Sequence, residues 1–342
     1  MAKGSWTKRK KLNLALQGGG AHGAYTWGVL DRLLEDGRID LTGISGTSIG
    51  AINATVMADG LCTGDHEKAR EKLADFWEKM GRLSYTSPIQ RMPWSKLTGN
   101  WTLNYSPGRM MMDAITNVWS PYEFNPMNFN PLHDLIESEI DFERVRKNRE
   151  FELFVCATNV KTGKTKVFAG EELTADAVMA SSCLPEYFHA VEIDGEHYWD
   201  GGFMGNPPLF PLFYRTNCAD VLLIQINPVE IEEVPKTAFA IHNRVNEITF
   251  NATLLRELRT IEFVSRLIDE GKLGDQYMQV RMHAIPAARE MLDLSASSKL
   301  NLEPAFLDYL KNLGRASAEA FLECDFDRVG KEATLDLRAM FS

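Results

Sequence analysis

The chain has 342 residues with 37 Lys and Arg against 47 Asp and Glu, and its formal net charge of −10 at pH 7 argues against nucleic acid as a partner. A hydrophobic content of 44% with 25% charged residues excludes a largely disordered chain, and no apolar run approaches the roughly 18 residues that cross a bilayer. The five cysteines have no Cys-x-x-Cys spacing, so we expect a cytoplasmic globular protein with no metal site, no cofactor and no disulfide framework.

The first predicted element is a buried strand over residues 12–17, which follows a basic tail at residues 1–11. We interpret the tail as solvated, with a weak electrostatic tether to a lipid surface as the alternative. The strand leads into a glycine-rich loop before a predicted helix at 24–35. Such a loop lets several backbone N–H groups converge on one oxyanion, although a flexible turn has the same composition. The loop consists of Gly18, Gly19, Gly20, Ala21, His22 and Gly23.

A Gly-x-Ser-x-Gly pentapeptide at residues 46–50 follows the next short apolar run and opens an Ala-rich helix that we predict to reach about residue 57. A strand that turns abruptly into a helix forces its corner residue into a strained conformation, which small neighbours such as Gly46 and Gly50 permit. The corner residue, Ser48, would stand at the positive end of the helix dipole, where developing negative charge is favoured. Ser48 is therefore the candidate nucleophile.

A stretch rich in Pro, Asn, Trp and Met follows an amphipathic helix predicted at 66–79. This loop-rich segment, residues 82–131, has the composition of a lid over an apolar ligand, because Met and aromatic side chains adapt to varied apolar surfaces. An irregular insertion packed into the core is an equal alternative. A further helix is predicted at 131–140.

The second candidate site residue is Asp200, in the sequence Asp200-Gly201-Gly202. The sequence before it predicts a hairpin of strands at 151–158 and 165–168, a small-residue helix at 174–182, and a second hairpin that ends at residue 199 and delivers Asp200. A carboxylate in that place is a candidate general base.

The remaining sequence predicts a final buried strand at 221–226, a helix at 241–268 with one apolar face, and a helix at 302–322. The apolar face of the longer helix would cover the core, with a dimer interface as the alternative. Because nothing resembles a linker, we expect one α/β domain, with a catalytic region at 12–215 and helical additions at 216–342.

Taken in order, the glycine-rich loop, the serine corner and the Asp-Gly-Gly sequence resemble the patatin-like phospholipase family. Residues 180–188 resemble the family's segment before the aspartate, so the similarity covers about 12–215. The resemblance implies a three-layer α/β/α sandwich with a mainly parallel sheet, and a Ser48–Asp200 dyad. It also implies an oxyanion hole in the loop Gly18, Gly19, Gly20 and Ala21, with Gly23, Gly46, Gly50, Gly201 and Gly202 supporting the motifs. The family commonly has arginine where this chain has His22, which puts the role of that arginine in doubt here.

We expect a serine acyl hydrolase acting on phospholipids or other long-chain esters, with peripheral contact to a lipid surface and an open oligomeric state. A Ser-Asp-His esterase or thioesterase with His242 or His283 as base is one alternative, and a storage-polyester depolymerase is another. In another class, the pattern Gly18-x-Gly20-x-x-Gly23 after a strand is typical of dinucleotide binding, but the second strand lacks the required terminal acid. A non-catalytic protein with this fold is the remaining alternative.

Overall fold

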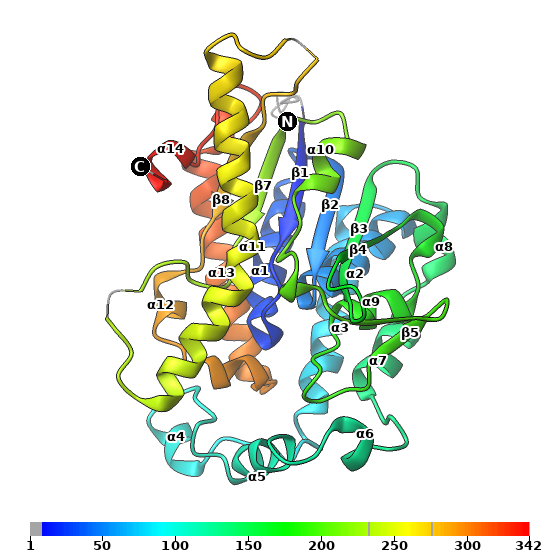
Figure 1. Cartoon of the computed structure of the whole chain (residues 1–342), viewed down its shortest axis with the longest axis vertical. Coiled ribbons are helices and arrows are strands. Elements are labelled where there is room, and N and C mark those ends of the chain that lie inside the picture. The colour runs from blue at the N-terminus through cyan, green and yellow to red at the C-terminus, as the bar shows by residue number, and fades with distance from the viewer. Residues whose placement is uncertain (1–8, 232, 275, 342) are drawn as a thin grey trace, which may run out of the picture.

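The computed structural model describes residues 9–231, 233–274 and 276–341 (Figure 1). Residues 1–8, most of the predicted basic tail, lie outside the described residues. The structure contains one eight-stranded mixed sheet. Its strands are β1 Lys10–Leu16, β2 Ile39–Thr47, β3 Glu152–Asn159, β4 Thr165–Ala169, β5 Val191–Ile193, β6 Glu196–Asp200, β7 Asp220–Ile224 and β8 Arg281–Ile285.

The strand order is β5-β6-β3-β2-β1-β7-β8, and β4 also pairs with β3. The five strands from β3 to β8 along this order are parallel, whereas β4, β5 and β6 join by antiparallel pairing. The helices are α1 Gly23–Asp36, α2 Ile49–Thr63, α3 His66–Leu83, α4 Pro93–Leu97, α5 Pro107–Thr116, α6 Pro121–Phe124, α7 Pro131–Glu139, α8 Phe142–Lys147, α9 Ala175–Ser181, α10 Phe210–Arg215, α11 Ala238–Asp269, α12 Arg289–Leu292, α13 Pro304–Cys324 and α14 Leu337–Met340.

Helices cover both faces of the sheet, so the chain forms a three-layer α/β/α sandwich. Along β1, Leu12, Leu14 and Leu16 join the core formed with α1, α2, α3, α9 and α13. Ala15, which points to the opposite face, joins a second core with α10 and α11. Alternating residues of one strand therefore supply two cores, as the period of two in a strand requires, and the predicted fold class is confirmed.

Most predicted elements are present, with three differences. The strand at 220–224, which the sequence predicts to be the final one, is followed by β8. The sequence of β8, Arg281 to Ile285, contains Arg and His and therefore does not have the apolar pattern of a buried strand. The segment predicted as loop-rich contains α4, α5 and α6, three short helices that each begin with proline at the first helical position. Among the described side chains of α11, the buried apolar residues Leu254, Leu258 and Ile261 lie in its second half, whereas Ile241, Val245 and Ile248 in its first half are exposed.

Among the described residues, no helix is both long enough and apolar enough to pass through a bilayer.

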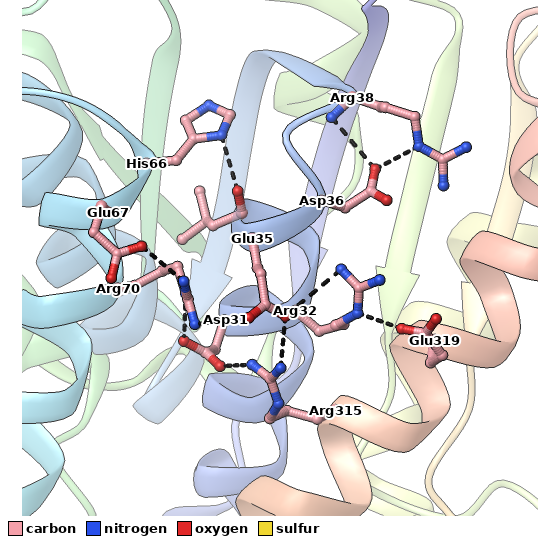
Figure 2. A network of polar contacts seen from close by, with 11 residues as sticks. Asp31, Arg32, Glu35, Asp36, Arg38, His66, Glu67, Arg70, Arg315 and Glu319 are labelled. Atoms are coloured by element: carbon pink, nitrogen blue, oxygen red, sulfur yellow. Dashed lines mark hydrogen bonds and ion pairs between the residues drawn. The ribbon is translucent and has the colours of Figure 1, made fainter. Parts of the chain in front are cut away.

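A network of charged side chains joins α1 to α3 and α13 (Figure 2). Asp31 of α1 lies at its centre with only 8% of its side chain exposed, and it accepts hydrogen bonds from Arg70 of α3 and Arg315 of α13. Glu35, one turn further along α1, pairs with the same two arginines at 3.2 and 2.6 Å. Arg32 of α1 adds an ion pair with Glu319 of α13. The network fixes the C-terminal helix α13 to the helix that follows the glycine-rich loop.

We predict that Asp31→Ala lowers the free energy of unfolding by about 2 to 3 kcal/mol, because it leaves two partly buried guanidinium groups without their central partner. The matched control is Glu78→Ala, which removes an exposed ion pair with Arg82 and should cost under about 0.5 kcal/mol. Urea denaturation measures both values. Equal, small losses in the two variants would contradict a structural role for the network.

Candidate active site

Ser48 stands at the corner between β2 and α2 with φ 54° and ψ −129°, a left-handed conformation that is rare for a residue with a side chain. Its neighbours leave no room for side chains. A Cβ added at Gly46 would lie 2.7 Å from the Ala51 nitrogen, and one at Gly50 would lie 2.3 Å from the Leu16 carbonyl oxygen. The pentapeptide therefore forms the strained corner that the sequence predicts, with Ser48 as the N-cap of a 15-residue helix.

Asp200 reaches Ser48 because β2 and β6 run toward each other along the same edge of β3. Parallel β2 ends with Thr47 opposite Cys156, and antiparallel β6 ends with Asp200 opposite Ala157, the next residue of β3. The opposite edge of β3 is occupied by β4. The two strand ends thus meet head to head.

The Ser48 hydroxyl lies close enough to the Asp200 carboxylate to favour its charged form, so the two side chains are neighbours at this corner. Asp200 is 1% exposed, whereas Ser48 is half-buried and open to a ligand. Burial raises the pKa of Asp200 to about 7, although the Gly202 N–H, 2.7 Å from Oδ1, and the Ser48 hydroxyl favour the charged form. The negative charge of Glu186 raises the pKa further. The carboxylate thereby gains the basicity that an ordinary aspartate lacks.

The glycine-rich loop lies against this pair. A Cβ added at Gly18 would lie 2.7 Å from the Ser48 Cβ, and Gly20 has φ 60°, where glycine is favoured. The 3-10 helix η1 Gly20–His22 follows, and its first N–H groups have no acceptor within the helix. The N–H of Gly18 is not free, because it donates to Asn206 Oδ1 at 2.6 Å. Of the four predicted oxyanion donors, Gly18 is thus engaged elsewhere, which leaves Gly19, Gly20 and Ala21.

Four polar side chains that no sequence motif marks hold the loop and the corner in place. Asn206 binds the Gly18 N–H, and Asn227 donates to the Gly18 carbonyl at 2.7 Å. Gln17 accepts from the Asn227 N–H at 3.0 Å and donates to the Asn206 carbonyl at 3.3 Å. Ser181 Oγ accepts from the Ser48 N–H at 2.9 Å. Of the four, Ser181 lies within residues 180–188, the segment that resembles the family, and Gln17 ends the first predicted strand.

His22 is a neutral imidazole in this structure. It is 4% exposed, and burial together with the nearby charge of Lys299 lowers its pKa to about 3. Its Nε2 lies 2.8 Å from Ser298 Oγ. His22 therefore fixes the loop to the C-terminal region and carries no positive charge.

The remaining motif glycines permit close packing around the site. A Cβ at Gly23 would lie 2.3 Å from Ile49 Cγ1, which packs α1 against the start of α2. A Cβ at Gly201 would lie 2.1 Å from the Cys156 carbonyl oxygen, and one at Gly202 would lie 2.2 Å from Phe250. The close packing of Gly201 and Gly202 holds the neighbouring Asp200 against β3 and α11.

The geometry does not bring His283 to Ser48. It lies on β8, three strand spacings or about 14 Å from β2, where it pairs with Asp220 at 3.0 Å and with Thr334 at 3.1 Å. The side chain of His242 lies outside the described residues. Within the described part of the chain, no group of three His, Cys, Asp or Glu residues is arranged to hold a metal ion.

The family profile described as patatin-like phospholipase matches residues 14–213, more than half of the chain. The chain belongs to the patatin-like phospholipase family. The matched range contains the glycine-rich loop, Ser48 and Asp200, and it excludes Asn227 and the C-terminal elements from β7 onward. No curated protein sequence matches the chain.

Three of the solved structures that match the chain are distant from it. VipD from Legionella pneumophila is 16% identical with a TM-score of 0.38, over 89% of this chain and 67% of that chain. The type III effector protein ExoU is 13% identical with a TM-score of 0.32, over 92% of this chain and 53% of that chain. ExoU of Pseudomonas aeruginosa in complex with SpcU is 14% identical with a TM-score of 0.34, over 92% and 54%. This chain therefore spans about two thirds of VipD and about half of ExoU.

Proposed function

We propose that this patatin-like protein is a serine acyl hydrolase that cleaves phospholipids or other long-chain acyl esters, with Ser48 as nucleophile and Asp200 as base. The observation that carries the proposal is that the half-buried Ser48 hydroxyl and the fully buried Asp200 carboxylate lie beside each other where β2 and β6 end. A serine is a weak nucleophile until an adjacent base accepts its proton. The pair meets that requirement without a histidine.

In the proposed reaction, Ser48 Oγ attacks the ester carbonyl carbon while its proton passes to Asp200. The N–H groups of Gly19, Gly20 and Ala21 bind the oxyanion of the tetrahedral intermediate. The intermediate expels the alcohol, which takes the proton from Asp200, and the acyl group remains on Ser48. Water then attacks the acyl-enzyme carbonyl while Asp200 takes its proton. The second tetrahedral intermediate expels Ser48 Oγ, which takes that proton back from Asp200, and the free acid leaves.

A lipid substrate is supported by an exposed apolar surface near the site. We call residues 84–131, with α4, α5 and α6, the lid segment. In Figure 1 it lies at the lower end of the molecule, toward which β1 and β2 point and near which α11 begins. The lid segment exposes large apolar side chains, which is unusual for a surface that meets only water. They are Tyr85, Met92, Trp94, Leu97, Tyr105, Met110, Met111, Val118, Trp119, Tyr122, Met127 and Phe129.

Two tryptophans of the lid segment have different environments. Trp94 is 73% exposed. Trp101 is partly buried, and its ring lies 5.0 Å from Phe306 and 5.8 Å from Tyr309 of α13, with the Arg91 guanidinium 4.3 Å from its centroid. We infer that Trp101 anchors the lid segment to α13, while Trp94 is free to contact lipid.

Ser48→Ala and Asp200→Asn should each lower kcat on a soluble ester by at least about a thousandfold, because each removes one half of the nucleophile and base pair. Steady-state kinetics on a short-chain p-nitrophenyl ester measures the loss. Both variants should retain the wild-type melting temperature within a few degrees. Substantial residual kcat in either folded variant would rule out the dyad.

The pH dependence of kcat/KM should follow the ionisation of Asp200. Because its pKa is raised to about 7, the carboxyl is protonated and inactive below that pH, and activity rises as pH increases through 7 to a plateau. At pH 5 the value should be about a hundredfold below the plateau. The measurement needs an uncharged ester and a melting curve at each pH as the control for folding. A flat profile between pH 5 and 8 contradicts this role for Asp200.

Trp94→Ala should reduce hydrolysis of phospholipid vesicles by about tenfold, since it removes a large apolar contact with lipid. Hydrolysis of the short soluble ester should not change. Tyr214→Ala on α10, where the side chain is 82% exposed, is the matched control and should affect neither substrate. Equal losses on vesicles and on the soluble ester would contradict a lipid-contacting lid segment.

A further inference from the structure

The C-terminal region contacts the glycine-rich loop directly. The 3-10 helix η4 Ala296–Leu300 packs beside η1. A Cβ at Gly20 would lie 2.4 Å from the Lys299 carbonyl oxygen, and Ser298 Oγ lies 2.8 Å from His22 Nε2. The loop that would bind the oxyanion is thus supported by residues that lie outside the range matched by the family profile.

Lys299 joins this contact through its amino group. Its Nζ donates to Asn227 Oδ1 at 2.7 Å. Within the residues that the structure describes, no carboxylate forms an ion pair with Lys299; Glu247 acts on it at longer range and is itself paired with Arg244 at 3.2 Å. Burial lowers the pKa of Lys299, which indicates that the ammonium is poorly hydrated.

Asn227 transmits the position of Lys299 to the loop. With Oδ1 occupied by the ammonium, its Nδ2 donates to the Gly18 carbonyl at 2.7 Å. A flipped amide would turn its NH₂ group toward the ammonium and leave the Gly18 carbonyl without this donor. In a planar trans peptide the C=O and the following N–H point in opposite directions, so a fixed Gly18 carbonyl also fixes the direction of the Gly19 N–H.

We propose that Lys299 is the positioning residue of the oxyanion-binding loop, acting through Asn227 on the Gly18–Gly19 peptide. The proposal rests on the proposed acyl hydrolase function. The amino group of Lys299 donates to Asn227 Oδ1. That oxygen lies beside Gly19, since a Cβ added at Gly19 would be 3.5 Å from it. A charged His22 beside Lys299 is excluded by their mutual repulsion and by burial.

The test is Lys299→Met, which keeps most of the side-chain volume and removes the amino group that donates to Asn227. We expect kcat on a short soluble ester to fall by about 10- to 100-fold, less than for loss of a direct oxyanion donor, with KM within about twofold of wild type. Lys299→Arg keeps the charge and should retain most of the kcat. Wild-type kcat in folded Lys299→Met overturns the proposal.

Lys311→Met is the matched control. Lys311 is also a partly buried lysine of the C-terminal region with a pKa lowered by burial, but its Nζ lies over the Trp27 ring at 4.1 Å. This variant should lose stability without the selective loss of kcat. An equal loss of kcat in Lys311→Met and Lys299→Met would overturn the positioning role, since it would indicate a general effect of removing a buried lysine.

A double-mutant cycle tests the route through Asn227. If Lys299 acts through this side chain, Lys299→Met should have little further effect on kcat in an Asn227→Ala background. If the double variant instead loses kcat by the product of the two single losses, Lys299 does not act through Asn227, and this part of the proposal is overturned. Wild type and Ser48→Ala are measured in the same assay: hydrolysis that does not depend on Ser48 contradicts the proposed function itself, whereas Ser48-dependent hydrolysis with an unaffected Lys299→Met contradicts only the positioning role.

Discussion

The head-to-head meeting of β2 and β6 on one edge of β3 is the constraint on which the candidate site depends. Thr47 and Asp200 lie opposite successive residues of β3, so backbone pairing determines how far the serine corner lies from the carboxylate. Thr47 Oγ1 donates to the Gly205 carbonyl at 2.6 Å, and Ser45 Oγ donates to the Pro208 carbonyl at 2.6 Å. These bonds fix the loop after Asp200 to the strand before Ser48, and a shift of register by one residue would separate the pair.

Burial shifts the pKa values of the titratable groups around the site. Burial raises the pKa of Asp200 to about 7. The hydrogen bond from the Gly202 N–H holds the carboxylate in its orientation. His22 has its pKa lowered to about 3, chiefly by burial, and Lys299 donates a hydrogen bond to Asn227 beside the glycine-rich loop. The proposed base and the proposed positioning residue thus come from segments that are far apart in the sequence, one on β6 and one on η4.

The sequence predicts the parts of the site where the backbone must pass so close to another segment that only glycine fits. Gly18, Gly46 and Gly50 are visible as motifs because a Cβ at any of them would lie within 2.8 Å of another atom of the site. Asn206, Asn227 and Lys299 could not be predicted, because an ordinary polar residue acts on the loop only through contacts that the fold creates. The sheet was predicted from its apolar strands. The strand β8 was missed because Arg281 and His283 interrupt its apolar pattern to pair with Asp220.

The Ser48–Asp200 pair is tested most simply by labelling the protein with a fluorophosphonate probe and locating the adduct by mass spectrometry. An activated serine attacks the phosphorus and displaces fluoride, so we expect a single adduct on Ser48 that forms much more slowly in Asp200→Asn. An adduct on another serine, or labelling of Ser48 at the same rate in folded Asp200→Asn, would contradict it.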